Sequence, residues 1–124
     1  MPNILLVGDQ VLARWTNNLY YRGHVSSFPS PTEIKILFTD GDRITHRVED
    51  GTAVIADEAP ATVHVRQHVL ATWSKKDKYY IGFIIDMASS VYKVLFDDGD
   101  EAWYNLRDLR VLPVLDRFQG KNQR

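Results

Sequence analysis

Short runs of alternating apolar and polar residues follow one another along the chain, separated by polar turns. In the first half these runs cover residues 10–15, 20–25, 33–38 and 43–48, with a further apolar segment near 53–55. A period of two predicts half-buried β-strands. The stretch 28–32 holds two prolines and predicts a loop. No window keeps the 3.6-residue period of a helix, so the pattern predicts an all-β fold.

The second half of the chain repeats the first. Trp15 and Trp73 end the matching segments Val-Leu-Ala-Arg-Trp and Val-Leu-Ala-Thr-Trp, with an offset of 73 − 15 = 58. Phe38 and Phe96 each precede an Asp-Gly pair, and their offset is again 96 − 38 = 58. An Asp-Gly pair between strands predicts a tight hairpin. In the second half we therefore expect strands near 67–73, 79–86, 91–96 and 101–105, then a 3₁₀ turn over 105–109 and a closing segment at 110–113.

Each copy is the length of one very small domain. About five short, bent strands are typical of an SH3-like barrel, in which closure removes exposed sheet edges. We predict two tandem barrels, the first over residues 1–58 and the second over 62–116, with a disordered polar tail at 117–124. Because the chain starts and stops close to these barrels, we expect it to be part of a larger protein or complex.

Composition narrows the class of protein further. The chain has 124 residues, 44% of them hydrophobic, no cysteine and a net charge of −1. The apolar fraction is too high for a disordered chain. Disulfides and cysteine zinc sites are excluded. No apolar run is long enough to span a membrane, and the first residues lack the basic start of a signal peptide. We expect no membrane contact.

Charge is distributed unevenly between the halves. Residues 1–60 hold five Lys/Arg against eight Asp/Glu, and residues 61–124 hold ten against eight, which gives −3 and +2. A duplex-binding domain usually has a strong basic surplus. Lys75, Lys76 and Lys78 form a local basic run that fits a solvated hairpin tip or a phosphate contact.

Catalytic and metal-binding constellations are not evident. His64 and His68 lie in strand-like sequence, where four residues span roughly 13 Å, which is too far for one ion. The aspartates lack the spacing of a calcium loop, and the glycines form no phosphate loop. We therefore predict neither an enzyme nor a metal or cofactor site.

One chemical pattern does occur in both copies, namely aromatic residues at strand ends beside carboxylates. A bent barrel can bring such strand ends to one rim. Aromatic faces attract cations, and a nearby carboxylate adds charge attraction and a hydrogen-bond acceptor. Rings of this kind also fill small barrel cores, and duplication alone does not separate the two roles. The candidate site residues are Trp15, Tyr21, Phe38, Asp40 and Asp42 in the first copy, and Trp73, Tyr80, Phe96, Asp98 and Asp100 in the second.

These segments resemble a known family. Residues 11–23 are similar to the opening of Tudor domains, most of all those of Polycomb-like proteins, and residues 94–100 resemble the third-strand motif of Tudor domains in general. The resemblance covers nearly the whole chain. It implies one aromatic cage per copy, with walls at Trp15, Tyr21 and Phe38 beside Asp40, and at Trp73, Tyr80 and Phe96 beside Asp98.

The chain also departs from the resembled pattern. Polycomb-like domains carry a fourth aromatic six residues after the phenylalanine, where this chain has Ile44 and Ala102. Some tandem readers carry one four residues after it, where this chain has Asp42 and Asp100. Three walls and an acidic side favour a lower methylation state, a methyl-arginine or an unmodified basic peptide. Trp103 has no aromatic counterpart in the first copy. It fits either a cage wall or packing in the core or between barrels.

The resemblance implies a nuclear, chromatin-associated tandem Tudor module. Its partner would be a methylated lysine or arginine on a histone-type tail or another basic peptide. Two alternatives stay open. One is a Tudor-type interaction scaffold with structural aromatics. The other is a DNA-binding module with weak nucleic-acid contacts through Arg66, Lys75, Lys76, Lys78 and Lys93.

Overall fold

The computed structural model describes residues 5–48, 51–73 and 75–112, and for residues 73 and 75–77 the backbone alone. The chain divides into two compact units, the first reaching Asp57 and the second spanning Glu58–Leu112. The predicted tail at 117–124, and the predicted barrel residues 113–116, lie outside the described residues. Strands form most of both units, which confirms the all-β, barrel-like fold.

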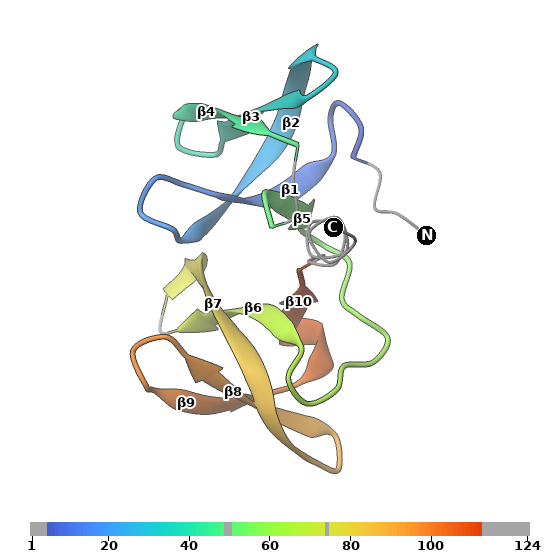
Figure 1. Cartoon of the computed structure of the whole chain (residues 1–124), viewed down its shortest axis with the longest axis vertical. Helices are drawn as coiled ribbons and strands as arrows, with labels where there is room; N and C mark the ends of the chain where they lie inside the picture. The colour runs from blue at the N-terminus through green and yellow to red at the C-terminus, as the bar shows by residue number, and fades with distance from the viewer. Residues whose placement is uncertain (1–4, 49–50, 74, 113–124) are drawn as a thin grey trace, which may run out of the picture. The chain divides into compact units, whose positions relative to one another are not determined.

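The described part of unit 1 contains five strands (Figure 1). They are β1 (Gln10–Arg14), β2 (Tyr20–Ser30), β3 (Glu33–Phe38), β4 (Arg43–Arg47) and β5 (Ala53–Ile55). All pairings are antiparallel, in the order β5–β1–β2–β3–β4. Half-buried and buried positions alternate along β3, and exposed and half-buried positions alternate along β4, as the period of two predicts.

Unit 2 repeats this arrangement. Its strands are β6 (His68–Trp73), β7 (Lys75–Ala88), β8 (Val91–Phe96), β9 (Glu101–Tyr104) and β10 (Leu109–Val111). They pair antiparallel in the order β10–β6–β7–β8–β9. A 3₁₀ turn, η1 (Leu106–Asp108), precedes β10, as the sequence predicts.

Matching positions build the two cores. Val11, Ala13, Val25 and Ile36 are fully buried in unit 1, in one cluster with Phe38. The unit 2 cluster places corresponding side chains together, namely Val69, Ala71, Ile84, Val94 and Phe96. The duplication therefore extends from the sequence to the packing.

Gly23 and Gly82 occupy the same place in the two copies, opposite the phenylalanine of the third strand. Gly23 pairs with Phe38, and Gly82 pairs with Phe96. A Cβ atom on Gly23 would lie 2.6 Å from the Leu37 carbonyl oxygen, and one on Gly82 would lie 2.7 Å from the Leu95 carbonyl oxygen. The long second strands can cross the third strands this closely because neither residue has a side chain.

Two sequence-based element boundaries are wrong. The predicted loop over 28–32 is strand as far as Ser30, and Ser30 pairs with Glu33. Pro29 is tolerated there because the register shifts between Ser27 and Ser30, where a ladder hydrogen bond is not required of every amide. The predicted strand at 79–86 begins at Lys75 and ends at Ala88, so the backbone of the lysine run belongs to β7, and Lys75 pairs with Trp73 where β6 and β7 meet.

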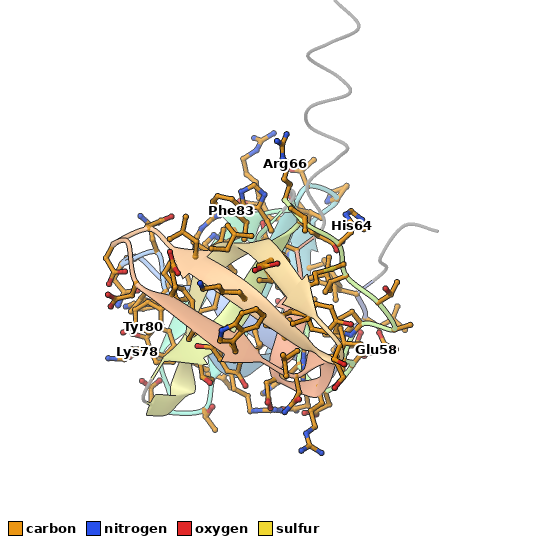
Figure 2. The ribbon with its side chains drawn as sticks, turned by 90° about the horizontal axis from the view of Figure 1, so that it is seen from below. Glu58, His64, Arg66, Lys78, Tyr80 and Phe83 are labelled. Atoms are coloured by element: carbon orange, nitrogen blue, oxygen red, sulfur yellow. The ribbon has the colours of Figure 1, made fainter. Side chains whose placement is uncertain are left out.

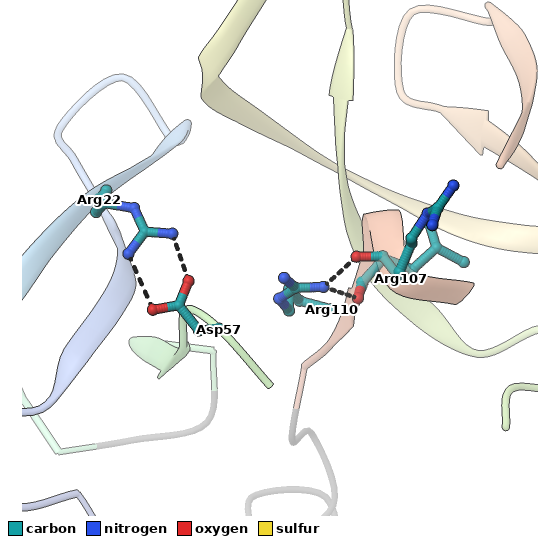
Figure 3. A network of polar contacts seen from close by, with 5 residues as sticks. Arg22, Asp57, Arg107 and Arg110 are labelled. Carbon is teal, nitrogen blue, oxygen red and sulfur yellow. Dashed lines mark hydrogen bonds and ion pairs between the residues drawn. The ribbon is translucent and has the colours of Figure 1, made fainter. Parts of the chain in front are cut away.

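A bidentate ion pair connects β2 to the end of unit 1. Arg22 donates from both terminal nitrogens to Asp57, at 2.7 and 3.3 Å (Figure 3). In unit 2, Arg110 donates to the carbonyl oxygens of Arg107 and Leu109, which holds η1 against β10. Among the described residues no helix is both long and apolar enough to cross a membrane.

Candidate functional site

The Asp-Gly turns give both units the same rim geometry. In unit 1 the amide of Phe38 donates to the carbonyl oxygen of Asp42 at 2.7 Å, and Gly41 closes the turn with φ of 97°. A positive φ of this size favours glycine. The Asp40 carboxylate accepts a hydrogen bond from the amide of Asp42 at 3.0 Å. Asp40 therefore stabilises the turn, and its exposed carboxylate lies two residues from the buried phenylalanine.

Unit 2 reproduces this turn bond for bond. The amide of Phe96 donates to Asp100 at 2.9 Å, and the Asp98 carboxylate accepts from the amide of Asp100 at 2.9 Å. Gly99 has φ of 94°. Asp97 and Glu101 add further acidic side chains to this turn, where unit 1 has Thr39 and Arg43. The unit 2 rim is consequently the more acidic of the two.

The three predicted aromatic residues of unit 1 do come together. The rings of Trp15 and Phe38 are 5.3 Å apart at 85°, and those of Tyr21 and Phe38 are 6.4 Å apart at 87°. Phe38 is only 5% exposed, whereas Trp15 and Tyr21 are partly buried at the edge of the core. Phe38 thus forms a buried floor, and each of the other two rings stands at right angles to it.

The turn between β1 and β2 holds two of these rings in place. The Trp15 amide donates to the carbonyl oxygen of Leu19 at 2.8 Å. Asn17 donates from its side-chain amide to the Tyr21 hydroxyl at 2.9 Å, and its carbonyl oxygen accepts from the amide of Leu19. Asn18 adopts φ of 68°, a left-handed conformation that asparagine tolerates. The polar segment Asn17-Asn18 therefore orients the aromatic walls.

In unit 2 the structure brings Tyr80 and Phe96 together, at 6.4 Å and 79°. Phe96 is 6% exposed and plays the same floor role as Phe38. Figure 2 labels Tyr80 close to Lys78, and Phe83 farther along the same strand, β7. The side chain of Trp73 lies outside the described residues, so its part in this cluster stays a prediction.

Tyr104 belongs to the unit 2 cluster, although the sequence reasoning did not include it. Its ring lies 6.2 Å from that of Phe96, at 81°. The residue at the matching position of unit 1 is His46, since 104 − 46 = 58. The two residues are not both Phe, Trp or Tyr, but both carry a ring with a hydrogen-bond donor, which is the signal that relates them in the sequence.

The hydroxyl of Tyr104, a half-buried side chain, is engaged in a hydrogen bond. It donates to the carbonyl oxygen of Thr72 at 2.5 Å. Burial, followed by the negative charge of Asp108, raises the pKa of Tyr104 above its ordinary value of 10.0. Tyr104 is therefore a neutral donor under all ordinary conditions.

Trp103 does not belong to the core, so that alternative is wrong. Its side chain is 46% exposed, and the Lys93 ammonium lies 5.7 Å from its ring centroid. Lys93 also forms an ion pair with Glu101 at 2.9 Å. Strand alternation explains the exposure, because Tyr104 faces the core and its neighbour must face outward.

Ile44 and Ala102 occupy the positions of the fourth aromatic in Polycomb-like domains. Both are partly buried and pack against the core of their units. Within the described residues, no group of three or more His, Cys, Asp or Glu residues could hold a metal ion. In both units the buried phenylalanine of the aromatic cluster is followed, two residues along the chain, by an exposed aspartate of the Asp-Gly turn.

Comparison with known structures defines the class of fold. The AGD34 part of Arabidopsis thaliana AGDP1 superimposes with a TM-score of 0.55 at 11% identity, over 87% of this chain and 88% of that chain. The tandem Agenet domain 3-4 of ADCP1 superimposes with a TM-score of 0.52 at 12% identity, over 85% and 78%. The fold is therefore that of a tandem Agenet, Tudor-like structure.

The family of the chain follows from its sequence. The family described as "Domain of unknown function (DUF4537)" matches residues 8–121, and the chain belongs to this family. No curated protein matches the chain. The comparisons support the Tudor-like fold in general and give no assignment to the Polycomb-like group.

Proposed function

We propose that the chain is a tandem Tudor-like binding module that recognises methylated lysine or methylated arginine on basic, histone-type tails. It would act in the nucleus, at chromatin, without catalysis and without a cofactor. The observation that carries this proposal is the geometry of unit 1. Trp15 and Tyr21 stand at right angles to the Phe38 floor, next to the turn that holds Asp40.

The physical basis is cation–π attraction. A methylated ammonium is poorly hydrated and gains from contact with ring faces, at about 0.5–2 kcal/mol for each favourable contact. A lower methylation state keeps an N–H group, which can donate a hydrogen bond to a carboxylate such as that of Asp40 or Asp98. The candidate site thus comprises Trp15, Tyr21, Phe38, Asp40 and Asp42 in unit 1, and Trp73, Tyr80, Phe96, Asp98 and Asp100 in unit 2.

A second candidate function is an interaction scaffold whose aromatic residues are structural. The burial of both phenylalanines favours this alternative, because Phe38 and Phe96 belong to the cores of their units. In that case the partner would be another protein segment, and methylation would not change its affinity. Nucleic-acid binding has less support, since Lys93 is engaged by Glu101 and Trp103.

An NMR titration separates these alternatives. The full chain, labelled with ¹⁵N, is titrated with lysine peptides carrying zero to three methyl groups and with methylated arginine peptides. The proposal predicts shifts of the Trp15 indole N–H and of the Gly41 and Gly99 amides that increase with methylation. Equal responses to methylated and unmodified peptides would favour the scaffold, and shifts with a DNA oligonucleotide alone would favour the third alternative.

A further inference from the structure

We propose that His46 and Tyr104 are positioning residues that fix, in each unit, the strand end from which the cage tryptophan projects. This inference rests on the proposed function, because it assigns a role in shaping the same two sites. The two residues carry out one task with different chemical groups.

The hydrogen bonds of the two residues match in their positions along the chain. His46 donates from Nε2 to the carbonyl oxygen of Arg14 at 2.6 Å. Tyr104 donates from its hydroxyl to the carbonyl oxygen of Thr72 at 2.5 Å. Donor and acceptor are 32 residues apart in both cases. The donors are separated by 104 − 46 = 58 residues and the acceptors by 72 − 14 = 58 residues.

The acceptors occupy a decisive place, because each directly precedes a predicted cage tryptophan. Arg14 is the last residue of β1 and is followed by Trp15. Thr72 is followed by Trp73, the last residue of β6. A carbonyl fixed at this point determines the direction in which the chain leaves the sheet, and hence where the next side chain starts.

The donors come from the strand that follows the Asp-Gly turn. His46 lies on β4, which pairs with β3, the strand that ends at Phe38. The hydrogen bond therefore ties the strand end bearing one wall to the hairpin bearing the floor. Unit 2 has the same arrangement, and there Tyr104 also packs directly on Phe96. In each unit a single side chain therefore adds a direct tie between this strand end and the hairpin.

Hydrogen-bond donation is what the two residues share. Histidine and tyrosine differ in size, in charge behaviour and in ring chemistry, but each places an N–H or O–H group at the matching carbonyl of its own unit. An apolar side chain would fill this space equally well if packing were the whole purpose. The two copies therefore share the donor, although the ring that carries it differs.

The test uses the full chain with 5-fluorotryptophan in place of tryptophan, read by ¹⁹F NMR. The variants are His46→Leu, which removes the donor, His46→Gln, which keeps an N–H group, and Tyr104→Phe, which keeps the ring. We expect His46→Leu to move the Trp15 fluorine signal and His46→Gln to restore it in large part. Tyr104→Phe should move the Trp73 signal and leave that of Trp15 in place.

Binding gives the second readout, followed for each unit through the Gly41 and Gly99 amides. We expect His46→Leu to weaken methylated-peptide binding at unit 1 about fivefold to tenfold, in line with the loss of one hydrogen bond. Tyr104→Phe should do the same at unit 2. Thermal unfolding of each variant shows whether it is folded, and Tyr104→Phe is the variant that changes least in volume.

The two proposals fail in different ways. If the unaltered chain binds methylated peptides and the donor-less variants bind equally well with unmoved fluorine signals, the positioning role is wrong and the proposed function stands. If the unaltered chain binds no methylated peptide, the proposed function is wrong. The fluorine signals then decide alone whether His46 and Tyr104 orient the tryptophans.

Discussion

Trp15 stands edge-on to Phe38, with 5.3 Å between the ring centroids and 85° between the ring planes. One member of this pair is buried in the core of unit 1, and the other lies at its edge. The contact therefore joins the part of the molecule that stabilises the fold to the part that is available for a ligand. Substitutions at the two residues should consequently have different effects.

Replacement of Phe38 by alanine should affect stability more than binding chemistry. The change empties a large volume in the core, and we expect the free energy of unfolding to fall by about 3–5 kcal/mol. Trp15→Ala, at the edge of the same cluster, should cost clearly less. Urea denaturation followed by circular dichroism measures both. A similar loss for the two variants would show that Trp15 is as much a core residue as Phe38.

Gly82→Ala should destabilise unit 2 by about 1–3 kcal/mol, because the new Cβ would lie 2.7 Å from both the Leu95 carbonyl oxygen and a Val94 methyl carbon. The strands must separate to relieve these contacts. The matched control is Gly41→Asn, at a turn where nothing lies within 4 Å and where asparagine tolerates the left-handed backbone. Denaturant midpoints compare the two. An Ala variant as stable as the unaltered chain would contradict the close approach of β7 and β8.

Stability should fall at alkaline pH because of Tyr104. The folded state raises the pKa of this phenol above 10.0, first through burial and then through Asp108. Folding therefore favours the protonated form, and this contribution is complete below pH 10. It is lost as the pH rises from 10 through the higher pKa of the folded state. Urea midpoints between pH 8 and 11 measure the decline.

The control for this pH effect is Tyr104→Phe, which has no ionisable hydroxyl at that position. Its stability should start lower, since the hydrogen bond to Thr72 is absent, and should decline less over the same pH range. Parallel pH profiles for the variant and the unaltered chain would show that another group causes the decline.

Two substitutions of Asp40 separate its hydrogen bond in the turn from the negative charge that it offers to a ligand. Asp40→Asn keeps an oxygen that can accept from the Asp42 amide, whereas Asp40→Ala removes it. We expect stability to change by less than about 0.5 kcal/mol for Asn and to fall by roughly 1 kcal/mol for Ala. Affinity for a methylated cationic peptide should fall several-fold in both. Unchanged affinity in Asp40→Asn would show that the Asp40 carboxylate does not contribute to binding.

Much of this architecture could be read from the sequence because the duplication repeats local signals. Alternation placed the strands, and the Asp-Gly pairs placed the tight turns that Gly41 and Gly99 close. The phenylalanine floors and their neighbours Tyr21 and Tyr80 also came together as expected. These features depend on residues that are close together in the sequence, so the sequence pattern is sufficient to predict them.

What the pattern missed depends on contacts distant in sequence. Tyr104 donates to a carbonyl oxygen 32 residues away in the sequence. Its counterpart in unit 1 is His46, which is not one of the Phe, Trp or Tyr residues that the repeat matches. The extension of β2 to Ser30 depends on a register shift that accommodates Pro29, which local propensity does not report. The outward position of Trp103 follows from the inward position of Tyr104.

Calorimetric titration of the full chain with one peptide in its unmodified and methylated forms tests the central claim most directly. The account predicts that methylation increases affinity, that Trp15→Ala and Tyr80→Ala each weaken this preference, and that Trp103→Ala, which removes an exposed tryptophan outside the clusters, leaves it unchanged. Equal affinity for unmodified and methylated peptides, or equal loss in all three variants, would contradict it.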